Sequence, residues 1–199
     1  DNDSLGIYDT GKGLHFLISR KGRNIAFSSL WDNYPDEVRI PITPKAKSYN
    51  AAYLMLAGTT NNMQSRIDNA LVIAEYEEGC ADTLHLENPI NWPTINEEYV
   101  FDDYAFWSAP VMPLRFRLDN GAVGRHINST ELLTTVPLKK ENKEKKIGEN
   151  NRYAIEKGAG VILKMPLNPA RRIRSIRIKT LSNDIVVGIM AITLQKTSD

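Results

Sequence analysis

Residues 51–79 have the sequence AAYLMLAGTTNNMQSRIDNALVIAEYEEG, in which two apolar runs, residues 51–57 and 71–76, flank a polar segment. Short runs rich in aliphatic, β-branched and aromatic residues, bounded by glycine, asparagine and aspartate, are typical of β-strands. Gly58 ends the first run and small hydrogen-bonding residues follow it, which indicates an ordered turn that crosses between two sheets. This stretch therefore predicts two strands of a β-sandwich.

The same composition recurs in further segments along the chain. They are residues 14–20, 23–29, 83–86, 114–118, 160–165, 172–180 and 185–195. The best helical candidates, 129–134 and 150–157, are short, and strands without long intervening helices favour antiparallel pairing because parallel neighbours need long crossovers. We predict an all-β fold: an antiparallel two-sheet β-sandwich of the jelly-roll type with minor short helices.

Two local features of this sandwich follow from the residue pattern. Lys21-Gly22 separates the segments 14–20 and 23–29, which predicts a hairpin between them because glycine tolerates a positive φ. The apolar parity shifts between Ile173 and Ile176, so a bulge near Arg174 would keep one inward face. The basic residues of this segment form either the solvated face of an outer strand or an anion-binding stripe. These basic residues are Arg172, Arg174, Arg177 and Lys179.

The chain is expected to form a single domain over residues 1–199. Its 199 residues are 42% hydrophobic and 25% charged, the balance of a globular domain that can bury a core without disulfides. Cys80 is the only cysteine, which excludes an internal disulfide. Residues 139–151, KKENKEKKIGENN, contain one apolar residue and predict a mobile surface loop within the domain, since strands after it are needed to complete the sandwich.

Charge and hydropathy exclude two classes of partner. Residues 1–110 carry 8 basic and 16 acidic side chains, whereas residues 111–199 carry 17 and 8, so opposite charges compensate within one domain and argue against nucleic-acid binding. No apolar run reaches the ~20 residues of a membrane span. Residues 1–4 lack the features of a signal peptide, which is therefore either missing or already removed.

Common catalytic and cofactor signatures are missing from the sequence. There is no G-x-S-x-G, G-x-x-x-x-G-K-[ST], G-x-G-x-x-G or H-E-x-x-H motif. His15, His85 and His126 lie far apart in sequence, and we interpret them as structural. We predict neither a cofactor nor a metal.

Several loops instead combine aromatic, amide and charged side chains. A flat aromatic ring can cover the apolar face of a sugar while amides and carboxylates bond its hydroxyls, so such loops predict contacts to a polysaccharide or oligosaccharide. The candidate contacts are Trp31, Asp32, Asn33, Tyr34, Asn61, Gln64, Arg66, Asn91, Trp92, Tyr104 and Trp107. The alternative is structural, because tryptophans before prolines plug the ends of sandwiches and loop amides bond their own backbone.

An acidic group near residue 100 offers two further alternatives. Two of its carboxylates could act as a glycosidase acid pair, which requires a separation of roughly 5 to 9.5 Å across a cleft. The same oxygens could also hold calcium, although the spacing of an EF-hand is missing. The acids are Glu97, Glu98, Asp102 and Asp103.

The loop sequences also carry a resemblance. Residues 27–42 (FSSLWDNYPDEVRIPI), 51–79, 82–99 (DTLHLENPINWPTINEEY) and 112–118 (MPLRFRL) resemble a β-sandwich domain attached to glycoside-hydrolase-like secreted proteins of polysaccharide-degrading bacteria. More distantly, the chain is similar to galactose-binding-like jelly rolls. The resemblance implies a periplasmic or extracellular location and a catalytic domain in the parent chain, and it implies no catalytic residues.

Together these observations give one leading hypothesis and two alternatives. The first is a non-catalytic accessory module that binds glycan weakly or packs on a catalytic domain. The second is a glycoside hydrolase or lyase fragment that uses the loop carboxylates. The third is a protein-interaction scaffold whose acidic half meets a basic partner surface.

Overall fold

The computed structural model describes residues 5–19, 22–43, 48–99, 113–125, 152–155 and 157–197. Antiparallel strands dominate these residues, together with one short 3₁₀ helix, η2 (Asn62–Gln64). The strands are β1 (Leu5–Asp9), β2 (His15–Ser19), β3 (Ala26–Ser29), β4 (Glu37–Pro41), β5 (Tyr49–Thr59), β6 (Asp68–Tyr76), β7 (Ala81–Glu87), β8 (Glu97–Tyr99), β9 (Leu114–Arg117), β10 (Val123–Gly124), β11 (Arg152–Ala154), β12 (Ala159–Pro166), β13 (Ile173–Thr180) and β14 (Val186–Lys196).

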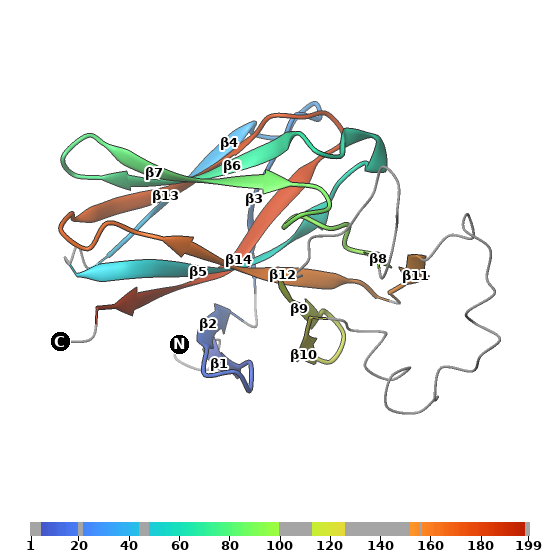
Figure 1. Cartoon of the computed structure of the whole chain (residues 1–199), viewed down its shortest axis with the longest axis horizontal. Coiled ribbons are helices and arrows are strands. Elements are labelled where there is room, and N and C mark those ends of the chain that lie inside the picture. The colour runs from blue at the N-terminus through green and yellow to red at the C-terminus, as the bar shows by residue number, and fades with distance from the viewer. Residues whose placement is uncertain are drawn as a thin grey trace.

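Two sheets stack face to face as the layers of a sandwich (Figure 1). One has the strand order β10-β9-β12-β5-β14-β3 and the other the order β4-β13-β6-β7. Among the eight strands β3–β7 and β12–β14, each successive strand lies in the opposite sheet except for the β6–β7 hairpin. This alternation is the jelly-roll arrangement of two Greek keys, so the predicted fold class is confirmed.

The main core lies between the two sheets. Along β5 the side chains of Leu54 and Leu56 point into it, and Val72 of β6 and Ile176 of β13 meet them from the other sheet, all at 0% exposure. This is the period of two that a half-buried strand requires. Each such side chain contributes about 1.5–3 kcal/mol of burial free energy, so the core stabilises the pairing of distant segments.

A second, smaller core lies on the outer side of the six-stranded sheet. The β1–β2 hairpin packs there (Figure 1), and Phe16 of β2 is buried with Met55, Phe116 and Ile162 of the sheet. Met55 is buried although it points away from Leu54 and Leu56. Because both faces of β5 are covered, its sequence is nearly continuous in apolar residues rather than alternating.

Of four local structures predicted from sequence, two are wrong and two lie outside the described residues. The hairpin between 14–20 and 23–29 is wrong, because β2 pairs with β1 through the Thr10–Leu14 turn, whereas β3 pairs with β14. The helix over 150–157 is also wrong, since β11 pairs with β8 there. The helix over 129–134 and the loop 139–151 lie outside the described residues.

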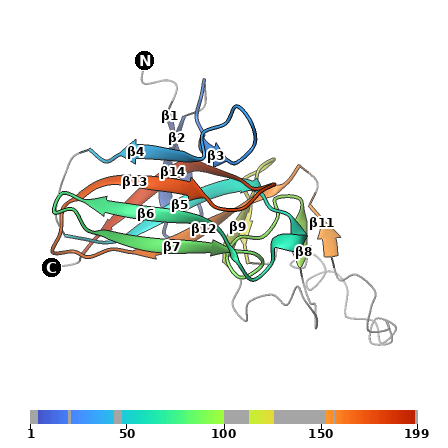
Figure 2. The same ribbon diagram turned by 90° about the horizontal axis from the view of Figure 1, so that it is seen from above.

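The predicted bulge in the basic segment is confirmed. The pairing of β13 with β6 shifts between Ile173 and Ser175, which leaves Arg174 as the extra residue. However, β13 is not an outer strand, because it lies between β4 and β6 (Figure 2). Its basic side chains therefore occupy the middle of a sheet face and do not protect an edge.

Candidate functional site

One end of the sandwich gathers several of the loops that sequence analysis selected. Val186, the first residue of β14, pairs with both Ser29 at the end of β3 and Thr59 at the end of β5. The loops that follow β3 and β5 therefore leave the sheet at the same end as the β13–β14 turn. Two side-chain bonds tie these loops to that turn: Ser29 Oγ donates to the Ile185 carbonyl (2.8 Å), and Asn61 Nδ2 donates to Asp184 Oδ2 (3.3 Å).

The loop after β3 exposes an aromatic surface. The side chains of Trp31, Tyr34 and Phe27 are 46%, 47% and 36% exposed. The Tyr34 ring meets Phe27 edge-on with centroids 5.3 Å apart, and it meets Trp31 at a tilt with centroids 6.5 Å apart. Both distances are in the range of favourable aromatic pairs. We call these three residues the aromatic patch.

Backbone hydrogen bonds hold this loop in place. The Tyr34 N–H donates to the Trp31 carbonyl (3.2 Å), and the Ser29 N–H donates to the Pro35 carbonyl (2.9 Å). Asn33 adopts a left-handed φ of 70°, a conformation that asparagine tolerates better than most residues. These bonds therefore fix the backbone of the loop that carries Trp31 and Tyr34.

Asp32 and Asn33 supply polar groups beside the aromatic patch. Both residues are exposed, and within the described part of the chain neither side chain makes a hydrogen bond. Their oxygens and amide are therefore available to a ligand. Of the predicted contacts, Trp31, Asp32, Asn33 and Tyr34 are thus brought together as one exposed group.

Trp92 lies in a different environment from Trp31 and Tyr34. Its side chain is 1% exposed and belongs to the main core. A Cβ placed on Gly58 would lie 3.0 Å from the Trp92 ring, so the indole occupies space that only glycine leaves free. This burial removes Trp92 from the set of ligand contacts and matches the alternative of a structural plug.

The predicted amide contacts serve the backbone of their own loops. The Asn61 side chain caps η2 by accepting the Met63 N–H (2.9 Å). Asn91 accepts the Glu87 N–H and donates to the His85 carbonyl, both at 2.8 Å. Asparagine in turns commonly bonds its own backbone in this way.

Gln64 and Arg66 lie in the same β5–β6 connection. The Gln64 carbonyl accepts a hydrogen bond from Asn69 Nδ2 (2.8 Å). Arg66 has a left-handed φ of 58° and an exposed side chain, and its N–H donates to the Asn88 carbonyl (2.8 Å). Only Arg66 of the pair therefore presents an exposed side chain.

The acidic group near residue 100 stays a prediction. Glu97 and Glu98 belong to β8, which pairs with β11. Their side chains lie outside the described part of the structure, as do four further predicted residues. These are Asp102, Asp103, Tyr104 and Trp107.

The described residues show how two histidines are held. His15 Nε2 lies 3.5 Å from Asp9 Oδ2, and His85 Nδ1 lies 2.8 Å from Asp68 Oδ2, each across a pair of neighbouring strands. Within those residues, no group of three or more His, Cys, Asp or Glu side chains is placed to hold a metal ion. In the same part of the chain, the helical structure is too short to cross a membrane.

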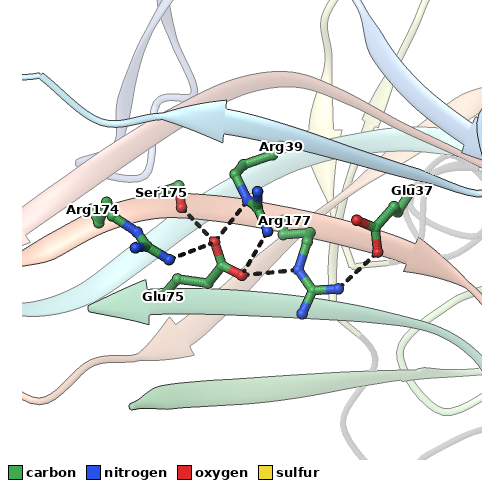
Figure 3. Close-up of polar contacts among 6 residues, drawn as sticks. All are labelled: Glu37, Arg39, Glu75, Arg174, Ser175 and Arg177. Carbon is green, nitrogen blue, oxygen red and sulfur yellow. Dashed lines mark hydrogen bonds and ion pairs between the residues drawn. The ribbon is translucent and has the colours of Figure 1, made fainter. Parts of the chain in front are cut away.

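A polar cluster lies on the outer face of the four-stranded sheet; sequence analysis named the basic residues of β13 but missed the carboxylate on which they converge. Three arginines surround the Glu75 carboxylate (Figure 3): Arg39 Nε lies 2.8 Å from Oε2, Arg177 Nε lies 3.0 Å from Oε1, and Arg174 Nη2 lies 3.6 Å from Oε2. Ser175 Oγ donates to Oε2 (2.7 Å). We call this group, with the neighbouring Glu37, the arginine cluster.

The arginine cluster holds Glu75 in its ionised form. Burial alone raises the pKa of this carboxyl group. Hydrogen bonds from Ser175 and Arg39, together with the positive charges of Arg39 and Arg177, outweigh burial and lower the pKa of Glu75 from 4.5 to about 2. Since Glu75 lies on β6 and its partners on β4 and β13, one carboxylate joins three strands.

Comparisons of the chain with protein-family models, curated proteins and solved structures find no match. The resemblance to domains attached to glycoside hydrolases therefore stays a prediction. Two features of the described residues remain for functional inference: the aromatic patch with its polar neighbours, and the arginine cluster.

Proposed function

We propose that this domain is a non-catalytic accessory module that binds saccharide weakly through the aromatic patch. The observation that supports the proposal is the exposure of Trp31 and Tyr34, at 46% and 47%, on a hydrogen-bonded loop that also presents Asp32 and Asn33. In this proposal the parent protein processes carbohydrate in the periplasm or outside the cell, and its catalytic domain is a separate unit.

The chemistry of the loop suits a sugar ring. A pyranose has an apolar face of C–H groups that an indole or phenol ring can cover, and equatorial hydroxyls that carboxylate and amide groups can bond. Because the Tyr34 ring already packs against Phe27 and Trp31, binding costs less side-chain entropy than it would for isolated rings. An exposed surface of this size covers only one side of a sugar, so a Kd on the order of 1 mM, about −4 kcal/mol, is expected.

A second function is favoured by the aliphatic surroundings of the aromatic patch. Ile25 and Leu30 are 43% and 38% exposed, and Ile25 and Phe27 both lie over Gly188 on β14. Aliphatic groups offer nothing to sugar hydroxyls but fit an interface between domains. In this version the patch packs against the catalytic domain of the parent chain.

Affinity electrophoresis against plant and host polysaccharides, followed by calorimetry on any polymer that retards the protein, tests the saccharide proposal. We expect Trp31→Ala and Tyr34→Ala to abolish the retardation. Leu17→Ala, which shortens an apolar side chain 60% exposed on β2, is the matched control and should leave it unchanged. Wild-type protein that no polysaccharide retards would reject saccharide binding and leave the packing function.

A further inference from the structure

The outer face of the four-stranded sheet carries an excess of positive charge. Along β13, Arg177 lies between Arg39 of β4 and Ile73 of β6, and Lys179 follows two residues later on the same face. With Arg174 in the bulge, four basic side chains face the two carboxylates of Glu37 and Glu75. Among these six residues positive charge is therefore in excess by two, and it is carried by β13 and by its neighbour, the edge strand β4.

Glu75 cannot satisfy all of these donors. Its Oε1 accepts hydrogen bonds from Arg39 Nη2 (3.2 Å) and Arg177 Nε (3.0 Å), and its Oε2 accepts from Ser175 and lies against Arg39 Nε. A carboxylate offers about four lone-pair sites, so Glu75 is saturated. Arg174 Nη2, at 3.6 Å, is too far for a hydrogen bond and makes only a longer ion pair.

Two guanidinium groups of the arginine cluster therefore keep unused donors in contact with solvent. The side chains of Arg39 and Arg174 are 54% and 49% exposed. Arg174 donates no hydrogen bond within the described residues, so its five N–H groups are available. Both side chains approach Oε2 of Glu75, which lies between their nearest nitrogens, so a ligand would meet the remaining, outward N–H groups of the two neighbouring guanidinium groups.

We propose that Arg39 and Arg174 bind the carboxylate of a uronic acid within an acidic polysaccharide. A guanidinium group matches a planar carboxylate with two parallel hydrogen bonds, and the excess charge of the face attracts a polyanion. The choice of a polysaccharide rests on the proposed function, whereas the anion site itself rests on the arginine cluster alone.

Calorimetry with polygalacturonate at low ionic strength, with neutral galactan as the uncharged reference, tests this site. Arg174→Gln should weaken the binding of polygalacturonate at least tenfold, the loss expected for one charged hydrogen-bonded contact. Arg23→Gln removes the same charge from an exposed residue before β3 and should change the affinity less than twofold. Glu75→Gln removes the competing negative charge and should strengthen binding, a direction that loss of folding cannot produce.

Two sets of outcomes overturn the proposal. Equal affinity of wild type and Arg174→Gln, or equal weakening by Arg23→Gln, would show attraction to overall charge and no site. Binding of dextran sulfate without binding of polygalacturonate would reject the assignment to a carboxylate.

The Trp31→Ala variant separates this proposal from the proposed function. If polygalacturonate binding depends on Arg174 but no polysaccharide binding depends on Trp31, the aromatic patch fails as a saccharide site while the anion site stands. A dependence on Trp31 without a dependence on Arg174 would reject the anion site and leave the aromatic patch as the saccharide site. The side-chain Nε–Hε resonances of Arg39 and Arg174 in ¹⁵N-labelled protein should shift on addition of monomeric galacturonate, and unchanged resonances would count against the site.

Discussion

Replacement of Glu75 by glutamine should destabilise the domain in a way that depends on pH. In the native state the pKa of Glu75 is lowered from 4.5 to about 2. At about 1.4 kcal/mol per pH unit, the difference corresponds to roughly 3 kcal/mol of folding free energy. Arg39, which contributes both a hydrogen bond and its charge to this shift, is half exposed and screened by solvent, so we expect the contribution to be about 2 kcal/mol.

The sign of the pH dependence follows from the direction of the shift. Above pH 4.5 the carboxyl group is ionised in both the folded and the unfolded chain, and the stabilisation is fully present. As the pH falls from 4.5 towards 2, the unfolded chain takes up the proton first, which favours unfolding. Below about pH 2 both states are protonated and the contribution is lost.

Urea unfolding of wild type and Glu75→Gln between pH 7 and pH 2 measures this contribution. The wild type should be about 2 kcal/mol more stable at pH 7, and the difference should shrink steadily below pH 4.5. Glu78→Gln, at an exposed position in the β6–β7 turn, is the matched control and should change the unfolding free energy by less than about 0.5 kcal/mol. A difference between wild type and Glu75→Gln that does not change with pH would refute the role assigned to the arginine cluster.

Two further substitutions test the packing at the loop end. Trp92→Ala should cost about 3–5 kcal/mol of unfolding free energy because the indole is buried. Trp31→Ala, at an exposed position, should cost less than about 1 kcal/mol. Equal losses in urea titrations would contradict the different burial of the two side chains. Gly58→Ala should destabilise by more than about 3 kcal/mol, since the new Cβ would lie 1.9 Å from the Val186 carbonyl oxygen; a stabilised variant in the same titration would show that β5 and β14 are further apart.

The strands that could be predicted from sequence are those with a buried face. The apolar runs 51–57 and 71–76 became β5 and β6, and the remaining predicted segments also contain strands, with bounds that differ by up to three residues. The missed strands bury little: β4 has only Val38 and Ile40 between charged residues, so its pattern resembles a loop. The hairpin prediction failed because pairing depends on which partner strand is available, and β1 had not been recognised.

The two tryptophan loops show what local sequence does not decide. Trp31 and Trp92 both lie close to a proline and an asparagine, and both were candidates for the same role. Trp92 is buried because Gly58, more than thirty positions earlier in the chain, leaves room for its indole beside the sheet. Trp31 stays exposed because its loop lies at the edge strand β3. The difference in exposure between the two tryptophans depends on how the sheets pack around each loop, and the sequence of neither loop determines it.

The arginine cluster could not be recognised from sequence for a related reason. Its members come from β4, β6 and β13, and in sequence Glu75 is one charge within an apolar strand. Only the basic segment of β13 gave a signal, and without knowledge of its neighbours that segment left open a solvated outer strand or an anion-binding stripe. The jelly-roll order places β13 between β4 and β6, which converts a row of arginines into a set of guanidinium groups arranged around one carboxylate. This arrangement brings Arg39 and Arg174 to the same oxygen of Glu75, and two guanidinium groups gathered at one point are what the proposed recognition of a single oxyanion requires.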